Sequence, residues 1–98
     1  MTSPDPAPGA RELVDDLRDA VLAVPGVADL HGGRFGEAAT YLPGRRVAGI
    51  RRLDDATEVH VTLLLGSPVR EVADAVRRVV AELAGPPVHV TVEDIVTP

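Results

Sequence analysis

The sequence contains no cysteine, no lysine and no tryptophan, and it has only one phenylalanine and one tyrosine. Without cysteine the chain cannot form a disulfide or bind a metal through thiolates. Without lysine it cannot form a Schiff base, a Walker-type phosphate site or a serine–lysine nucleophile pair. The shortage of aromatic residues means that the hydrophobic core is aliphatic, and the chain supplies 16 Val, 10 Leu, 2 Ile and 13 Ala for it.

The chain also lacks a long hydrophobic run and an export signal. Nowhere do about 18 apolar residues follow one another, so the sequence predicts no transmembrane helix. Residues 1–9 hold three prolines and neither a basic segment nor an apolar stretch, which predicts a disordered leader and not a signal peptide. The length of 98 residues fits one domain, over residues 10–96. With no cysteine and no export signal, we expect a cytoplasmic protein.

Two segments have the periodicity of amphipathic helices. Apolar residues recur every three or four positions over residues 10–24 and again over 68–84. Pro25-Gly26 ends the first of these helices, because proline cannot donate the next helical hydrogen bond. We expect the Ser67 side chain to cap the second helix and Gly85 to end it.

Alternation of apolar and polar residues predicts the strands. Residues 38–46 lack a clear alternation and are expected to be mostly loop. The fold class is therefore α+β: a small mixed sheet of three or four strands with two helices packed on one face, in the order helix, strand, strand, helix, strand. The expected strands are 27–31, 47–53, 58–65 and 88–95, the second being an edge or bulged strand around Gly49.

The outward face of the last two strands carries His60 and His89, with Glu58 and Glu93 nearby. Imidazole and carboxylate are ligands that zinc accepts. Polar residues are also ordinary on the solvent face of a sheet that is covered on one side only. We favour the solvated face, and we predict no metal site and no cofactor.

A glycine pair and the serines give weaker signals. Gly33-Arg34-Phe35-Gly36 has the GxxG spacing with which KH domains hold a nucleic-acid backbone. In a KH domain this loop joins two helices, whereas here it precedes predicted strands. A small KH-like nucleic-acid-binding module is therefore only the alternative function. Ser3 lies in the leader and Ser67 is explained as a helix cap. We therefore predict no catalytic residue and no enzyme.

Positive charge is concentrated in residues 31–53, although the whole chain has a net charge of −5. This segment holds five of the ten arginines and one glutamate, a balance of +4, whereas residues 1–30 carry −4 and residues 54–98 carry −5. Two interpretations remain open. The arginines protect an edge strand from aggregation, or they form a contact surface for an anionic partner, with Leu42 as a further apolar anchor. The candidate partner-binding residues are Arg34, Phe35, Tyr41, Arg45, Arg46, Arg51 and Arg52.

Several short segments, taken in their order and spacing, resemble one known family. They are Val24-Pro25-Gly26-Val27, Leu30 with Gly32-Gly33, Val59-His60-Val61, Gly66-Ser67-Pro68-Val69 with Val72-Ala73, and the run from Val88 to Ile95. Across residues 10–95 the chain resembles the alkaline shock protein family of envelope stress response proteins. That family brings no catalytic motif, so no active residue is carried over.

The resemblance implies a function without catalysis. It implies a small α/β domain in the bacterial cytoplasm, linked to cell-envelope homeostasis and self-associating. It also implies a membrane-anchored envelope protein as the partner, which holds the domain at the inner face of the membrane without direct membrane insertion. Binding to nucleic acid is not expected on this interpretation.

Overall fold

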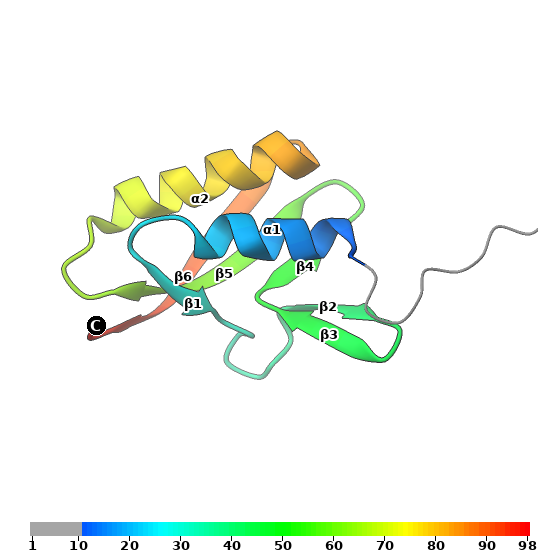
Figure 1. Cartoon of the computed structure of the whole chain (residues 1–98), viewed down its shortest axis with the longest axis horizontal. Helices are drawn as coiled ribbons and strands as arrows, with labels where there is room; N and C mark the ends of the chain where they lie inside the picture. Colours follow the sequence, from blue (N-terminus) through cyan, green and yellow to red (C-terminus); the bar gives the residue numbers. More distant parts are fainter. Residues whose placement is uncertain (1–10) are drawn as a thin grey trace, which may run out of the picture.

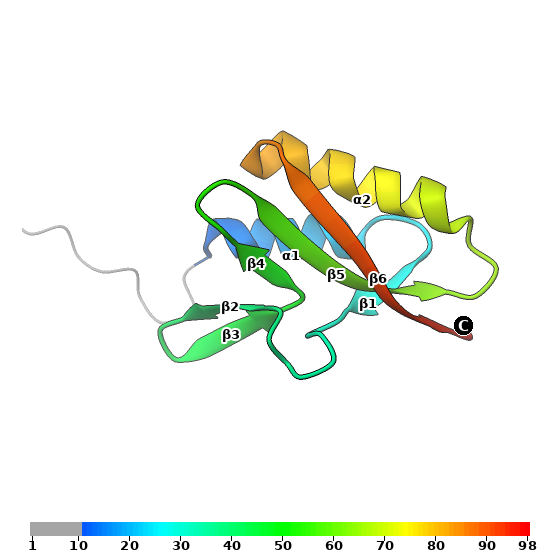
Figure 2. The ribbon, with the colours of Figure 1, turned by 180° about the vertical axis from the view of Figure 1, so that it is seen from behind.

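The computed structural model describes residues 11–98, so the predicted leader over residues 1–9 lies outside the described residues. Both helices lie on one face of a small sheet, in front of it in Figure 1 and behind it in Figure 2. This arrangement confirms the predicted α+β class, and the structure adds a separate two-stranded sheet. The elements in chain order are α1 (Leu13–Leu22), β1 (Val27–Leu30), β2 (Ala39–Leu42), β3 (Arg45–Ala48), β4 (Ile50–Arg52), β5 (Thr57–Leu64), α2 (Val69–Ala84) and β6 (Val88–Val96).

The helices form where the apolar periodicity predicts them, and each buries one stripe. Leu17 and Val21 of α1 and Val76 and Val80 of α2 are fully buried against the sheet. Helix α2 ends at Gly85 as expected, at a φ of +82° that favours glycine. Its start differs from the expectation, because no side chain caps it and the extended Pro68 is the capping residue in place of Ser67. Among residues 11–98, no helix is both long and apolar enough to cross a membrane.

Strand β5 is the centre of the four-stranded sheet. Strand β6 runs parallel to it along one flank, and β1 and β4 pair antiparallel with the two halves of the other flank. Alternation over residues 58–65 predicts Val59, Val61, Leu63 and Leu65 on the inward face, and the first three are fully buried. Leu65 is a correction, because β5 ends at Leu64 and Leu65 is 61 % exposed. The core therefore lies between this face of the sheet and the two helices.

Strands β1 and β4 meet at His60, in the middle of β5. The His31 N–H donates to the His60 carbonyl and the His60 N–H donates to the Gly49 carbonyl, both at 2.8 Å. Gly49 has a φ of +88°, and a Cβ atom there would lie 2.6 Å from the Leu30 Cβ and 3.0 Å from the His60 carbonyl oxygen. The chain reverses at this residue, and only glycine fits the positive φ and the small space there. The expected single strand over residues 47–53 is therefore wrong, since Gly49 divides it into β3 and β4.

The expectation of a loop over residues 38–46 is also wrong. Strands β2 and β3 form an antiparallel hairpin with Tyr41 opposite Arg46, closed by Pro43 and Gly44. Each strand has only four residues. The hairpin buries Ala39 and Val47, and a single alanine gives a weak apolar signal in so short a strand. Alternation over so few residues does not predict a strand.

We predict that Gly49→Ala destabilises the protein far more than Gly44→Ala. Both glycines have positive φ values, +88° and +76°, but only at Gly49 would the new methyl group meet other atoms. We expect a loss of about 1–2 kcal/mol at Gly44 from conformation alone, and of about 3 kcal/mol or more at Gly49 from conformation and overpacking together. Urea unfolding curves measure both values, and equal losses would contradict the close approach at His60.

Candidate functional site

The β2–β3 hairpin leaves the main sheet at Gly49 and is fastened to the domain at its base. The Thr40 hydroxyl donates to the Ile50 carbonyl at 2.6 Å, and the Gly49 N–H donates to the Ala38 carbonyl at 2.7 Å. Ala38 and Val47 are buried beside the core. These contacts make the hairpin a fixed platform for the side chains that it exposes.

Alternation along β3 separates two neighbouring arginines. Arg46 lies opposite Tyr41 in the hairpin register, so both side chains stand on the same face. Tyr41 is 70 % exposed. Arg45 stands on the other face together with the buried Val47, toward α1. The two arginines therefore have different surroundings although they are adjacent in sequence.

Arg45 forms a partly buried, bidentate ion pair with Asp15. Its guanidinium donates to both carboxylate oxygens of Asp15 at 2.7 Å and 2.8 Å, and the Glu12 N–H donates to the same carboxylate at 2.7 Å. The Arg45 hydrogen bonds and the Glu12 N–H hold the pKa of the Asp15 carboxyl well below its usual range. Arg45 thus joins the hairpin to the start of α1, and we leave it out of the candidate surface.

Three of the sequence-predicted residues come together in one groove. Tyr41, Arg51 and Arg52 line an open groove of about 510 Å³ between the hairpin and β4. Arg51 also lies 3.7 Å from a carboxylate oxygen of Glu58 on β5. The remaining lining residues are Glu37, Ala39 and Thr40.

Arg34 and Phe35 lie at the tip of the loop between β1 and β2. The Phe35 N–H donates to the Glu37 carboxylate at 2.9 Å, and Phe35 is 86 % exposed. The N–H groups of Glu37 itself and of Phe35 lower the pKa of the Glu37 carboxyl. This loop joins two strands, whereas the GxxG loop of a KH domain joins two helices. The structure therefore lacks the KH arrangement around Gly33 and Gly36.

Arg34 faces a second hollow, of about 470 Å³, which His31, Glu93 and Asp94 also line. The imidazole Nδ1 of His60 lies 2.8 Å from a Glu93 carboxylate oxygen, so this histidine is engaged by an acid. Within residues 11–98, no three histidine, aspartate or glutamate side chains gather in a way that could hold a metal ion.

Arginines with and without an acidic partner occur both at the helices and at the hairpin end, since Arg70 and Arg78 of α2 form no ion pair among residues 11–98. Arg11, Arg18 and Arg77 each pair with an aspartate close in sequence. No carboxylate of residues 11–98 forms an ion pair with Arg34, Arg46 or Arg52. We define the arginine surface as Arg34, Phe35, Tyr41, Arg46, Arg51 and Arg52.

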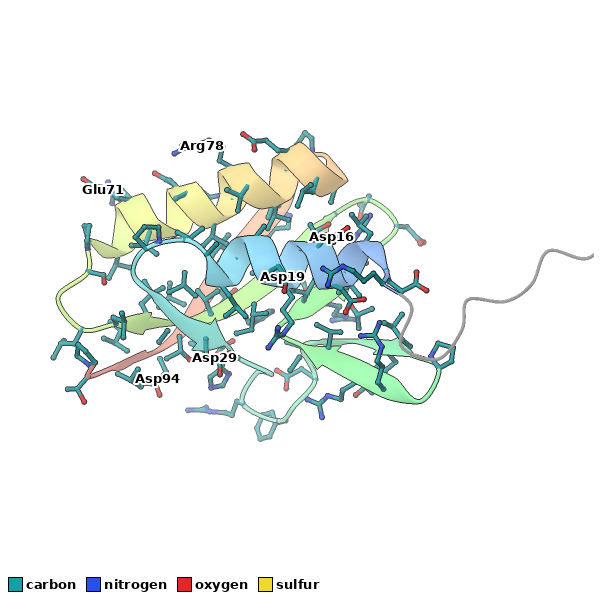
Figure 3. The ribbon with its side chains drawn as sticks, in the orientation of Figure 1. Asp16, Asp19, Asp29, Glu71, Arg78 and Asp94 are labelled. Atoms are coloured by element: carbon teal, nitrogen blue, oxygen red, sulfur yellow. The ribbon has the colours of Figure 1, made fainter. Side chains whose placement is uncertain are left out.

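Helix α1 presents the opposite charge to solvent, whereas acidic and basic residues balance on α2. Figure 3 shows Asp16 and Asp19 on the exposed side of α1, and Glu71 with Arg78 on the outward side of α2. The first turn of α1 also holds Asp15, and its last turn holds no basic residue. The domain is therefore acidic over α1 and basic at the hairpin end.

Comparisons with known proteins give no match, since no family model, no curated protein and no solved structure matches this chain. Two of the segments that carry the family resemblance nevertheless meet in space. Val24-Pro25-Gly26 and Gly66-Ser67-Pro68 line one hollow beside α2. A Cβ atom at Gly26 would lie 2.7 Å from a methyl group of Val72. These residues therefore serve the packing of the turns against α2.

We predict that the Asp15–Arg45 pair contributes stability that acid removes. Because the Asp15 pKa is lowered on folding, this contribution is complete above the unfolded value of about 3.9 and is lost as the pH falls below it. Thermal melts between neutral and strongly acidic pH will show a shallower acid decline for Asp15→Asn than for the parent.

The matched control is Asp55→Asn in the β4–β5 turn, which removes the same charge from an exposed position. This variant should follow the acid decline of the parent. A parallel decline for Asp15→Asn as well would show that the ion pair does not stabilise the fold.

Proposed function

We propose that this protein is a non-catalytic interaction domain of the envelope stress response type, whose arginine surface binds an acidic protein partner at the inner face of the membrane. The observation that carries the proposal is the exposure of Phe35 and Tyr41 on a surface where three of the four arginines form no ion pair among residues 11–98. Tyrosine and arginine are the residue types most enriched where protein interfaces concentrate their binding energy.

Edge protection explains only part of this surface. Arginines on β4 discourage pairing with a foreign strand, and this accounts for Arg51 and Arg52. It gives no reason for the exposure of the only phenylalanine and the only tyrosine of the chain. Exposed aromatic side chains beside cations favour a contact surface.

The magnitudes favour a protein over bare lipid as the partner. Each exposed arginine contributes about 1 kcal/mol near an anionic membrane, so Arg34, Arg46, Arg51 and Arg52 together contribute about 4 kcal/mol. That sum corresponds to a dissociation constant of about 1 mM. Repulsion from the acidic remainder of the chain weakens the binding to lipid further. A partner that also buries Phe35 and Tyr41 supplies the missing affinity, and the arginines then set orientation and association rate.

The resemblance to the alkaline shock protein family supports the rest of the proposal. It supplies the bacterial cytoplasm as the compartment, cell-envelope homeostasis as the process and a membrane-anchored protein as the partner. It also supplies self-association. The KH-like alternative loses its main support, because the loop around Gly33 and Gly36 lies between two strands.

We predict that replacing Arg46, Arg51 and Arg52 by glutamine lowers binding to membranes of the source cells at least about fivefold, with the fold retained, because electrostatic orientation is lost. The matched control replaces Arg70, Arg77 and Arg78 on α2, which removes the same charge from the other side of the domain. Thermal melts check folding, and sedimentation with membrane vesicles measures binding.

Two further arms identify the partner class. Protease treatment of the vesicles should abolish binding, and protein-free anionic vesicles should bind only weakly. Retained binding by the hairpin triple variant would contradict the arginine surface. Binding to single-stranded RNA that falls steeply with salt would favour the nucleic-acid alternative, because phosphate contacts release counterions.

A further inference from the structure

Strand β2 leaves one edge of the hairpin unpaired. Among the described residues it pairs only with β3. Figure 2 shows β2 on the side of the hairpin nearer to β4. Residues of β2 and β4, but none of β3, line the groove that holds Tyr41, Arg51 and Arg52. An unpaired strand edge presents backbone groups that accept a further strand, and here this edge opens into the groove.

A hydrogen bond at the base of the hairpin identifies the backbone groups on this edge. The Ala38 carbonyl accepts from the Gly49 N–H, so it points toward the β3 side. Backbone groups alternate between the two sides of a strand. Those of Thr40 therefore also point toward β3, and those of Ala39 and Tyr41 point away from it. Within residues 11–98, no backbone hydrogen bond outside the hairpin uses the N–H or C=O of Tyr41.

Strand β4 brings positive charge and further backbone groups to the same groove. The Thr40 hydroxyl donates to the Ile50 carbonyl, so this carbonyl faces the hairpin. By the same alternation the N–H and C=O of Arg52 point toward the groove. Arg52 forms no ion pair with a carboxylate of residues 11–98. The carboxylate of Glu37 in the lining already accepts from the Phe35 N–H at 2.9 Å.

We infer that the acidic partner contributes an extended segment, which pairs as a third strand with the β2 edge and places a carboxylate on Arg51 and Arg52. This inference rests on the proposed function and names the form in which the partner binds. Ala39 and Tyr41 offer the N–H and C=O groups for the pairing. Because side chains alternate along a strand, a segment with an acid at every second position presents all its acids to one face.

An extended segment satisfies this edge better than a helix or a flat surface. Either of these would cover the Tyr41 N–H and C=O without bonding them, and a buried backbone group without a partner costs more than its hydrogen bond contributes. A strand bonds these groups and brings its side chains beside the guanidinium groups. Strand β6 also has an open edge, but its own acids, Glu93 and Asp94, repel an acidic segment.

A pair of variants at Tyr41 isolates the backbone contact. Tyr41→Pro removes an N–H that faces the open edge, a position where edge strands tolerate proline. Tyr41→Val is the matched control, because it also removes the phenol ring but keeps the N–H. We expect Tyr41→Pro to bind membranes of the source cells at least about fivefold more weakly than Tyr41→Val, which corresponds to about 1 kcal/mol, the net contribution of one hydrogen bond. Thermal melts check that both variants fold.

Amide hydrogen exchange of the parent chain, measured by NMR, tests the same edge without membranes. The probe is a capped synthetic peptide of about six residues, the usual length of a strand, in which glutamate and threonine alternate. A peptide of lysine and threonine is the control for charge. At a concentration equal to its dissociation constant, the glutamate peptide should slow exchange of the Tyr41 amide about twofold. The Thr40 amide, which faces β3, should not change, and the lysine peptide should have no effect.

The outcomes separate this inference from the proposed function. Equal binding of Tyr41→Pro and Tyr41→Val to membranes that bind the parent would overturn the strand pairing and leave the arginine surface standing. If the parent binds no membranes, the proposed function fails and the exchange measurement decides the pairing. It also decides if Tyr41→Pro does not fold. Protection of Tyr41 by the glutamate peptide alone supports the pairing, whereas no protection, or equal protection by both peptides, overturns it.

Discussion

The close approach of three backbone segments at His60 is the constraint on which the rest of the fold depends. One flank of β5 accommodates two strands, β1 and β4, whose ends meet at His31 and Gly49. The space left for a side chain at Gly49 is so small that the Leu30 Cβ would clash with a methyl group there. Because the chain reverses at Gly49, β3 turns away from the main sheet and pairs with β2.

One face of the resulting hairpin packs against the domain, and the other faces solvent. One face carries Arg45 and Val47 and is fastened to the domain by the Asp15 ion pair and by burial. The other face carries Tyr41 and Arg46 into solvent. Because successive side chains of a strand point to opposite faces, Arg45 fastens the hairpin to the domain while its neighbour Arg46 stays available for binding. The fixed base also means that a partner pays little entropy to order this surface.

The sequence was most informative where its periodicity was long. Both helices and the strands β5 and β6 follow from sustained patterns, because each buries a continuous row of aliphatic residues such as Val59, Val61 and Leu63. The hairpin cannot be predicted in this way, because strands of four residues are too short to show a period. The pairing of Tyr41 with Arg46 depends on this hairpin and could not be predicted either. Gly49 stands out in the sequence as an irregular position, but its close approach to Leu30 depends on a strand distant in sequence.

The ion pair of Arg45 cannot be predicted from a sequence pattern, since its partner Asp15 is thirty residues away. Strand order was equally inaccessible, so the open edge of β6 became visible only in the structure. The arginine surface itself reaches the β6 side of the sheet, because Arg34 lines a hollow together with Glu93 and Asp94 of β6.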